Sequence, residues 1–325
     1  MFSRKKIVFV APFLKPFIQE DLDTLEQHYV VRKRIGTGPF QAVRVFFAAL
    51  GGDLVICWFA SVYAAIAVIA ARWVGVKSIV IVGGVDAAKE PQFNYGMWNT
   101  PWKSRMLSYA LPRADKILPV EHALGENISR FAGYDGKNIF DLPTGYDSSF
   151  WKPLGEKEPI VLTVASARGR IEIKGLDTLV EAARLLPEQK FLLIGTTADD
   201  LRGFDPPPNI TFIPELSRTD LLPYYRRAKI YCQPSRLEGM PNTLCEAMLC
   251  AAIPVVTDIP GHRTAVGTEG IFSPVGEAGS LAEGITQVLK LPDAHGMRSR
   301  ARIVAMFPKE KRERELLRIV GELIS

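Results

Sequence analysis

The sequence is poor in the residues that build disulfide frameworks and metal centres. It contains 4 cysteines and 4 histidines in 325 residues, and no two cysteines have Cys-x-x-Cys spacing. The cysteines stand in apolar segments, which predicts buried thiols in a reducing compartment rather than disulfides. No His/Cys/carboxylate cluster has the spacing of a metal site, so we expect no resident metal. The four cysteines are Cys57, Cys232, Cys245 and Cys250.

The chain also lacks a strong charge imbalance. Its net charge of +5 arises from 40 basic and 35 acidic residues. This mild excess suits anionic ligands or a loose peripheral contact with an anionic membrane surface, and it does not favour nucleic acid as a partner.

Long apolar runs are scarce. The run at 7–11 is too short for the core of a signal peptide and leads directly into Pro12. The stretch 54–71 is long enough to be considered as a membrane span, but the segment 57–62 divides it into a strand-like and a helix-like part. We therefore expect a buried strand and helix there, in a cytoplasmic protein that could associate with a membrane.

The sequence does contain enough apolar residues to form a large hydrophobic core. A hydrophobic content of 47% over 325 residues suits about two domains. Short apolar runs alternate with longer periodic ones in both halves, which predicts an α/β protein with parallel, doubly wound sheets. A polar, Pro-rich stretch at 142–159 separates the halves. Strands are expected at 6–11, 29–35, 54–58, 78–82, 116–119, 160–165, 191–194, 210–213, 228–232 and 253–257, and helices at 18–28, 62–74, 104–111, 125–131, 175–186, 220–228, 279–289 and 309–324.

The most informative stretch is 234–248, Pro-Ser-Arg-Leu-Glu-Gly-Met-Pro-Asn-Thr-Leu-Cys-Glu-Ala-Met. It follows a short strand, turns through 238–241 and enters an apolar segment without proline at 242–251. Asn242 or Thr243 is the expected N-cap, because a short oxygen-bearing side chain accepts a free N–H of the first helical turn. The remaining N–H groups and the helix dipole predict a phosphate site at this helix start.

Two carboxylates border the same helix start. Glu238 precedes the helix and Glu246 lies one turn inside it. Because carboxylates accept hydrogen bonds from sugar hydroxyls, a phosphate site with two of them predicts a nucleotide sugar as the ligand. The alternative is a buried strand–turn–helix with two incidental glutamates. The expected donor-binding residues are Gly239, Met240, Pro241, Asn242, Thr243 and Glu246.

The pair Glu238 and Glu246, with seven residues between them, resembles the E-x7-E motif of retaining glycosyltransferases with the GT-B fold (glycosyltransferase group 1, family 4 type). The glycine, proline, asparagine and Glu-Ala-Met of the motif also agree. The resemblance covers nearly the whole chain and is strongest at 174–256. It implies that Glu246 holds the ribose and Glu238 the donor sugar. It also implies a reaction without metal, cofactor or covalent enzyme intermediate.

The resemblance further implies two Rossmann-like domains that face each other across a cleft. The expected boundaries are 1–152 for an acceptor-side domain and 153–308 for a domain that binds the nucleotide-sugar donor. The remaining segment, 309–325, is expected to be a helix that packs back on the first domain.

A second candidate segment, 168–175, reads Arg-Gly-Arg-Ile-Glu-Ile-Lys-Gly at the end of a strand. Its cations, Arg168, Arg170 and Lys174, could grip a diphosphate and neutralise charge as it leaves. The family resembled carries an Arg and a Lys here, and either arginine fits, with Arg168 slightly favoured. A solvated basic loop is the alternative.

The first half offers fewer candidates. Asp86 follows a strand and could accept a hydrogen bond from a substrate hydroxyl, with a turn-forming Asp as the equal alternative. Gly83 and Gly84 permit close backbone approach to an acceptor, and Tyr95 lies in an aromatic stretch that could border it. Compared with the family, the loop at 11–16 lacks glycine and no histidine lies near Asp86.

Two positions in the second half carry further expectations. His262, in the segment Pro-Gly-His-Arg, is expected to be a surface turn residue. Ala251 stands where the family commonly ends its helix with glycine. Because alanine is costly in a left-handed C-cap, we expect this helix to end differently.

The sequence thus predicts a retaining, metal-independent glycosyltransferase that moves a sugar from a nucleotide diphosphate to a hydroxyl of a glycan, a lipid-linked carrier or a small molecule. A catalytically weak, nucleotide-sugar-binding subunit of a glycosylation complex is the alternative, and a GT-B-fold epimerase or phosphorylase is less favoured. The expected catalytic residues are Glu238, Lys174, Arg168 and Asp86.

Overall fold

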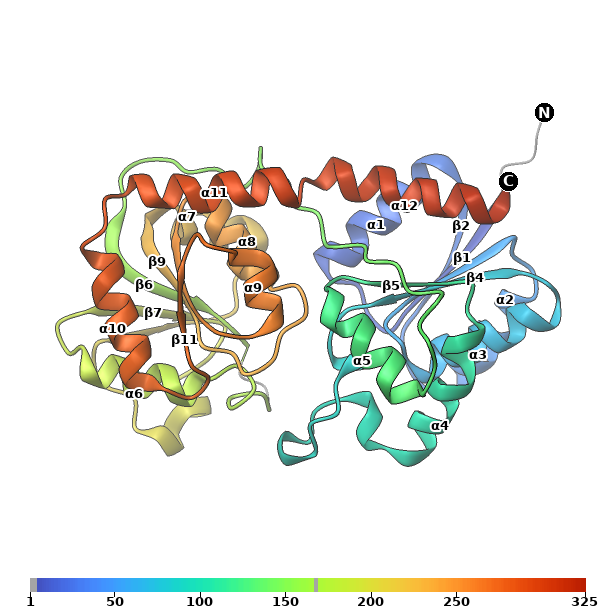
Figure 1. Cartoon of the computed structure of the whole chain (residues 1–325), viewed down its shortest axis with the longest axis horizontal. Helices are drawn as coiled ribbons and strands as arrows, with labels where there is room; N and C mark the ends of the chain where they lie inside the picture. The colour runs from blue at the N-terminus through green and yellow to red at the C-terminus, as the bar shows by residue number, and fades with distance from the viewer. Residues whose placement is uncertain (1–4, 167–168) are drawn as a thin grey trace. The chain divides into compact units, whose positions relative to one another are not determined.

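The computed structural model describes residues 5–166 and 169–325 (Figure 1). The chain forms two compact units. The first comprises the chain up to Gly145 together with Glu310–Ser325, and the second comprises Tyr146–Lys309. Each unit contains its own sheet and its own hydrophobic core.

The first unit is built on a five-stranded parallel sheet in the order β2-β1-β3-β4-β5. Its central strands read as apolar runs because helices cover both faces of the sheet (Figure 1). The strands are β1 (Lys6–Ala11), β2 (Val30–Ile35), β3 (Leu54–Trp58), β4 (Lys77–Val82) and β5 (Lys116–Pro119), and the helices between and after them are α1 (Pro16–His28), α2 (Pro39–Ala49), α3 (Val62–Trp73), α4 (Pro101–Ala110) and α5 (His122–Ala132).

The second unit is built on a six-stranded parallel sheet in the order β11-β10-β9-β6-β7-β8. Its core includes the fully buried Val161, Ile230 and Val255 from three neighbouring strands. The strands are β6 (Glu158–Val164), β7 (Lys190–Ile194), β8 (Ile210–Ile213), β9 (Ala228–Gln233), β10 (Ile253–Thr257) and β11 (Ile271–Ser273), and the helices are α6 (Leu176–Leu185), α7 (Arg218–Arg227), α8 (Asn242–Leu249), α9 (Pro260–Val266), α10 (Ala278–Leu289) and α11 (Ala294–Met306).

The last helix, α12 (Lys309–Ile324), is tied into the first unit by a buried ion pair. The Arg312 guanidinium donates to both carboxylate oxygens of Asp21, on α1, at 2.7 Å each. It also donates to the carbonyl of Leu142, and the Trp58 indole N–H donates to Asp21. Because the polar groups of this pair are hydrogen-bonded, these bonds compensate the free-energy cost of removing the two charges from water.

The doubly wound α/β architecture expected from the sequence is confirmed, and the stretch 54–73 is indeed a strand and a helix. Helix α2 was not indicated by the sequence. Gly38 precedes it without a side-chain cap, and apolar side chains occupy both its buried and its exposed face, so no amphipathic period stands out. In the part of the chain that the structure describes, no helix is long and apolar enough to cross a membrane.

The four cysteines are free and buried, as expected. Burial raises the pKa of each thiol above its ordinary value, so all four stay protonated near neutral pH.

Candidate functional site

The informative stretch forms the end of β9, a loop and the start of α8. The expected N-cap was wrong, because α8 begins at Asn242 with Pro241 in the N-cap position. The Asn242 side chain instead accepts a hydrogen bond from the Tyr146 hydroxyl at 2.9 Å, and the Thr243 side chain bonds that of Tyr231. Pro241 at the N-cap offers no capping hydrogen bond, so within the described residues the backbone N–H groups of the first turn of α8 can serve a ligand.

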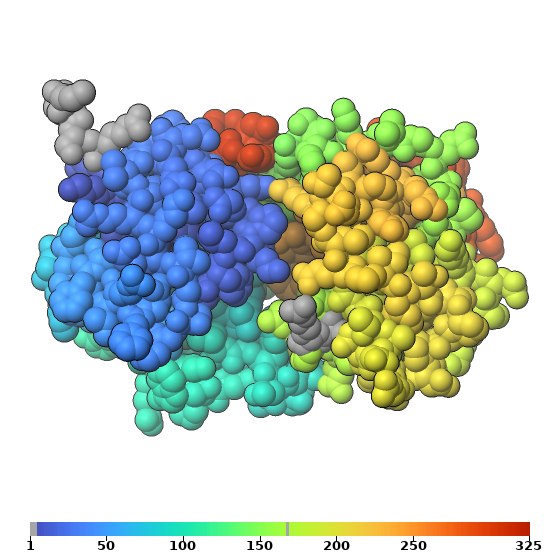
Figure 2. All heavy atoms as spheres, turned by 180° about the vertical axis from the view of Figure 1, so that it is seen from behind, coloured from blue at the N-terminus to red at the C-terminus, as the bar shows by residue number. Residues whose placement is uncertain are grey.

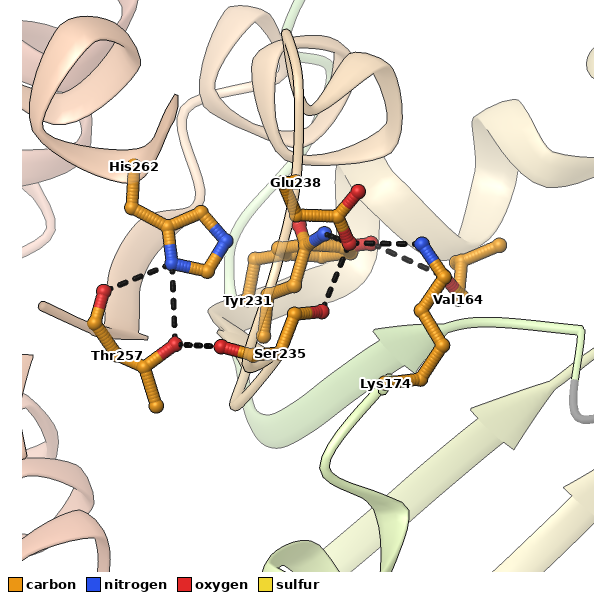
Figure 3. Close-up of polar contacts among 8 residues, drawn as sticks. Val164, Lys174, Tyr231, Ser235, Glu238, Thr257 and His262 are labelled. Atoms are coloured by element: carbon orange, nitrogen blue, oxygen red, sulfur yellow. Dashed lines mark hydrogen bonds and ion pairs between the residues drawn. The ribbon is translucent and has the colours of Figure 1, made fainter. Parts of the chain in front are cut away.

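Glu238 lies at the centre of a compact polar cluster in this loop (Figure 3). Its Oε1 accepts hydrogen bonds from Lys174 Nζ at 2.7 Å, Gln233 Nε2 at 2.7 Å and Ser235 Oγ at 2.8 Å. No described residue donates a hydrogen bond to its second oxygen, Oε2. One oxygen thus fixes the carboxylate and the other is left for a ligand.

The charge of Glu238 is set by two opposing effects. Burial alone would raise the pKa of this carboxyl, since its side chain is only 12% exposed. The adjacent Lys174 ammonium and the Ser235 hydroxyl outweigh burial, and the pKa is held below its ordinary value. Glu238 is therefore an ionised acceptor near neutral pH.

His262 borders this cluster and is fully buried, which corrects the expectation of a surface turn residue. Its Nδ1 lies 2.8 Å from the carbonyl oxygen of Thr257, which fixes Nδ1–H as a donor (Figure 3). Burial lowers the pKa of His262 to about 4, so the ring is neutral at physiological pH. Its Nε2 is buried and has no hydrogen-bond partner among the described residues.

Lys174 reaches Glu238 because two loops interlock. Gly175, at φ +63°, lies so close to Pro234 that a Cβ here would stand 1.9 Å from the proline carbonyl oxygen. The Arg236 guanidinium forms a two-fold ion pair with Asp177 at 2.8 and 2.6 Å, and its backbone N–H donates to the Ile173 carbonyl. Only glycine fits at this crossing, which explains the Lys-Gly pair in the sequence.

Glu246 faces a different set of partners from the same helix start. Its Oε2 accepts a hydrogen bond from the Tyr225 hydroxyl at 3.3 Å, and its Oε1 lies 3.7 Å from Nε of Arg218. The Arg218 guanidinium also lies over the Trp151 ring, 5.1 Å from its centroid. The Glu246 side chain is only 13% exposed and its carboxylate is held from two sides, so it presents a fixed hydrogen-bond acceptor.

The remaining expected donor residues shape the loop itself. Gly239 supports the close approach of α9, because a Cβ on Gly261 would lie 2.1 Å from its carbonyl oxygen. Met240 is buried beside it. Arg170 is exposed on the turn before Lys174. Arg168 lies outside the described residues.

Helix α8 ends in a left-handed alanine, contrary to expectation. Ala251 has φ +63°, its N–H donates to the carbonyl of Met248, and the N–H of Ala252 donates to that of Ala247. These two bonds form the Schellman motif, which commonly uses glycine at the left-handed position. The strain of a left-handed Ala251 is tolerated because the motif satisfies the last carbonyls of the helix.

In the first unit, Asp86 does not present a carboxylate to a substrate as expected. Its side chain is fully buried, and its oxygens accept hydrogen bonds from the backbone N–H groups of Ala60, Gly83 and Gly84 at 2.7 to 3.2 Å. Burial raises its pKa, against these hydrogen bonds. Asp86 therefore organises the loops that follow β3 and β4, and the turn-forming alternative fits it better.

The other residues expected on the acceptor side belong to the same loop system. Gly83 packs so closely on Phe59 that a Cβ would lie 2.5 Å from its ring. Gly84 adopts φ +148°. Tyr95 pairs with Glu90 through two backbone hydrogen bonds, at 2.8 and 3.0 Å. Their assignment to an acceptor stays a prediction.

Several polar residues of the second unit were missed by the sequence analysis. Each ends or follows a buried strand or lies in the first turn of a helix, the usual place for ligand groups in a parallel sheet, and that position was the available signal. These residues are Gln233, Ser235, Arg236, Arg218 and His262.

Taken by itself, the second unit brings the Lys174 cation, from the segment between β6 and α6, to the two fixed carboxylates and the helix start of the segment β9–loop–α8. Such a set can hold a phosphate group beside a polyhydroxylated group.

Residues 147–304 match the family model described as glycosyl transferases group 1. A Campylobacter jejuni N,N'-diacetylbacillosaminyl-diphospho-undecaprenol alpha-1,3-N-acetylgalactosaminyltransferase is 29% identical over 43% of this chain and 38% of its own length. A Mycobacterium tuberculosis D-inositol 3-phosphate glycosyltransferase is 27% identical over 64% of this chain and 50% of its own. The chain thus spans half or less of the curated relatives it matches.

Solved structures show the same fold over nearly the whole chain. Anabaena HepE, solved in complex with UDP and glucose, superposes with a TM-score of 0.80 at 15% identity and covers 98% of this chain and 99% of its own. The sucrose-phosphate synthase of Thermosynechococcus elongatus gives a TM-score of 0.80 at 16% identity, with the same coverage of both chains. The chain therefore has the GT-B fold, and its residues 147–304 match the group 1 glycosyltransferases.

Proposed function

We propose that this protein is a retaining glycosyltransferase that transfers a sugar from a nucleoside-diphosphate donor to an acceptor hydroxyl. The observation that carries the proposal is the 2.7 Å contact between Lys174 Nζ and Glu238 Oε1 at the start of α8. In a nucleotide sugar the diphosphate and the sugar hydroxyls are adjacent groups. A cation beside a carboxylate that accepts hydrogen bonds is complementary to the junction between the diphosphate and the sugar.

The leaving diphosphate is the group that most needs stabilisation. In this proposal the ammonium of Lys174 and the N–H groups at the start of α8 receive the negative charge that develops as the bond to the anomeric carbon breaks. Arg170, or Arg168, adds a further cation. Each such contact contributes about 10²-fold or more to the rate in sites of this kind.

The two carboxylates have separate roles in the proposal. Glu238 accepts hydrogen bonds from the donor sugar through Oε2, while Oε1 stays anchored by its three donors. Glu246 accepts from the ribose hydroxyls. No residue is assigned as a covalent nucleophile, and no cofactor or metal is part of the proposal.

Support for a nucleotide donor also comes from relatives. HepE was solved with UDP and, separately, with UDP-glucose. The Campylobacter relative is named for transfer to an undecaprenyl-linked sugar, and the mycobacterial one for transfer to inositol phosphate. We accordingly propose a cytoplasmic enzyme whose acceptor is a glycan, a lipid-linked sugar or a small molecule.

Calorimetric titration with a panel of nucleoside diphosphates and nucleotide sugars tests the proposal, with donor hydrolysis followed in parallel. The variants are Glu246→Ala and, as a control on the exposed side of α10, Glu283→Ala. Selective binding of one diphosphate sugar, lost only in Glu246→Ala and accompanied by slow hydrolysis, supports the transferase. A chain that binds no nucleotide would refute it.

A nucleotide-sugar-binding subunit is the second candidate. It is favoured by one observation: Asp86 is fully occupied by backbone N–H groups and cannot act on a substrate in that state. Tight donor binding without turnover, after a screen of acceptors, would select this function over catalysis.

A further inference from the structure

Three hydrogen-bond acceptors of the Glu238 cluster have no donor among the described residues. The Glu238 carboxylate receives its three donors on Oε1, which leaves Oε2. The Gln233 amide donates to Glu238 through Nε2, and its own oxygen, Oε1, is buried without a partner. The Nε2 atom of His262 is buried without a partner as well. Unpaired buried acceptors destabilise a folded chain, so three in one cluster indicate a ligand that donates hydrogen bonds.

The existing contacts fix each of these groups as an acceptor. His262 is neutral and donates through Nδ1–H to the Thr257 carbonyl, so its Nε2 carries a lone pair. Only the N–H arm of the Gln233 amide can donate to the Glu238 carboxylate, so the other arm is the oxygen. Near neutral pH, the cluster therefore has no internal proton that would turn one of the three acceptors into a donor.

The three acceptors come from neighbouring elements of the sheet. Gln233 ends β9 and His262 lies in the first turn of α9, which follows β10, and β9 and β10 pair directly. Figure 3 shows the Nε2 edge of the His262 ring turned toward Glu238 and the Nδ1 edge turned toward Thr257. Burial lowers the pKa of His262, and the Glu238 carboxylate opposes that shift, as expected for a ring near the charge.

The cluster is closed on most sides. Helix α7, drawn in gold in Figure 2, lies at the surface of the second unit and packs against β9. Gln233 is nearly buried and His262 is fully buried, whereas the side chains of Glu238 and Lys174 keep 12% and 24% exposure. A ligand therefore meets the cation and the carboxylate first and the two neutral acceptors behind them.

We propose that Gln233 and His262 complete the sugar pocket of the donor site together with Glu238, and that this pocket takes a neutral sugar whose hydroxyl groups donate to all three. This inference rests on the proposed function. The Lys174 ammonium uses one of its three N–H groups for Glu238, so it has others to offer to the diphosphate beside the sugar. The acceptors then receive the hydroxyl donors that they lack.

The chemistry of the pocket also argues against an acidic sugar. A uronic acid would bring a further carboxylate to atoms that are all acceptors, and one of them already belongs to an anion. Neither carboxylate would gain a donor there, and both would lose water. A neutral sugar with free hydroxyl groups is the better match.

The test is calorimetric titration of the full chain with UDP-glucose, UDP-galactose and GDP-mannose, each compared with its monodeoxyfluoro analogues. Fluorine takes the place of a hydroxyl group but cannot donate a hydrogen bond. In His262→Asn the shorter amide can still donate to the Thr257 carbonyl, but nothing replaces Nε2. In His262→Gln an amide oxygen reaches the position of Nε2. His295→Asn, in α11, is the matched control, and thermal melting verifies that each variant is folded.

We expect wild type to bind the analogues fluorinated at two or more positions about 10-fold more weakly than the parent nucleotide sugar. His262→Asn should abolish this difference at one position, while His262→Gln and His295→Asn should keep it. Gln233→Met, which removes the second neutral acceptor, should abolish the difference at another position.

Binding of UDP or GDP without any dependence on the sugar hydroxyls overturns this inference alone. So does an unchanged pattern in both His262→Asn and Gln233→Met, which would mean that buried water serves the two neutral acceptors. A chain that binds no nucleotide at all refutes the proposed function, and this inference falls with it.

Discussion

Breaking the contact between Lys174 and Glu238 tests the centre of the candidate site. The variants are Lys174→Met, Glu238→Gln and the double variant, since these changes remove charge with little change of volume. The pair is neither fully exposed nor fully buried, with side chains 24% and 12% accessible. Its coupling should therefore exceed that of a surface pair, which is below about 1 kcal/mol, and fall short of a fully buried one.

We expect a coupling free energy of about 2 kcal/mol at neutral pH, in the range of hydrogen bonds to charged groups. The pH dependence has a definite sign. Because Lys174 and its neighbours hold the pKa of Glu238 below its ordinary value of 4.5, the stabilisation is present above that value. It is lost as the pH falls through the lower pKa of the folded protein.

The assay is a double-mutant cycle from urea unfolding, with hydrogen exchange of the amides of the second unit measured alongside. Exchange isolates the second unit, in which both residues lie. A coupling below about 0.5 kcal/mol at neutral pH would refute the reasoning. So would an undiminished coupling in strong acid, because a protonated Glu238 cannot form the ion pair.

Three further predictions concern the second unit. Gly175→Ala should lower the free energy of unfolding in urea by about 3 kcal/mol, because the new Cβ would lie 1.9 Å from the Pro234 carbonyl oxygen and alanine is also strained in this left-handed conformation. Gly155→Ala is the control: Gly155 has φ +75° but lies in open space, so this change should cost only about 1 kcal/mol. The pKa of His262 falls from 6.5 to about 4 on folding, so between these pH values the unfolded chain binds more protons than the folded chain. The free energy of unfolding should therefore drop by roughly 3 kcal/mol as the pH falls from 6.5 to 4. His262→Gln should remove this drop in acid-unfolding curves. Lys157→Met should lower the free energy of unfolding by about 3 kcal/mol in thermal unfolding, because the Lys157 ammonium donates to three backbone carbonyls at 2.7 to 3.0 Å. A loss below about 0.5 kcal/mol would show that these carbonyls find other donors.

The parts of the fold that were predictable are those in which local pattern and tertiary role agree. Strand β1 and strand β10 are apolar runs buried on both faces, and their bounds follow from composition alone. Helix α2 has apolar side chains on its exposed face as well as its buried one, so its period is masked. The exposed apolar side chains of α2 are therefore the reason why the sequence pattern did not indicate this helix.

The candidate site could be predicted where neighbours in sequence are also neighbours in space. Glu238 and the start of α8 belong to one loop, and Lys174 precedes a glycine that a crossing of two loops requires. Burial was not predictable in the same way. His262 is buried because Gly261 lets α9 approach the carbonyl of Gly239, a contact between segments that follow different strands.

Asp86 illustrates the same limit in the first unit. Its sequence position, after a strand and two glycines, is shared by catalytic and structural aspartates. The difference lies in the N–H of Ala60, which belongs to another loop and occupies the carboxylate. Only the folded chain shows that this donor is already in place.

The pairing of Asp21 with Arg312 joins residues 291 positions apart and has a consequence for biosynthesis. A ribosome releases the chain from its amino end, so the partner of Asp21 emerges only after the whole second unit has been made. Until then the first unit lacks α12, and Asp21 lacks the cation with which it pairs in the folded chain. The second unit is one continuous segment and needs no such wait. During translation the later-made unit can therefore be the first to finish folding.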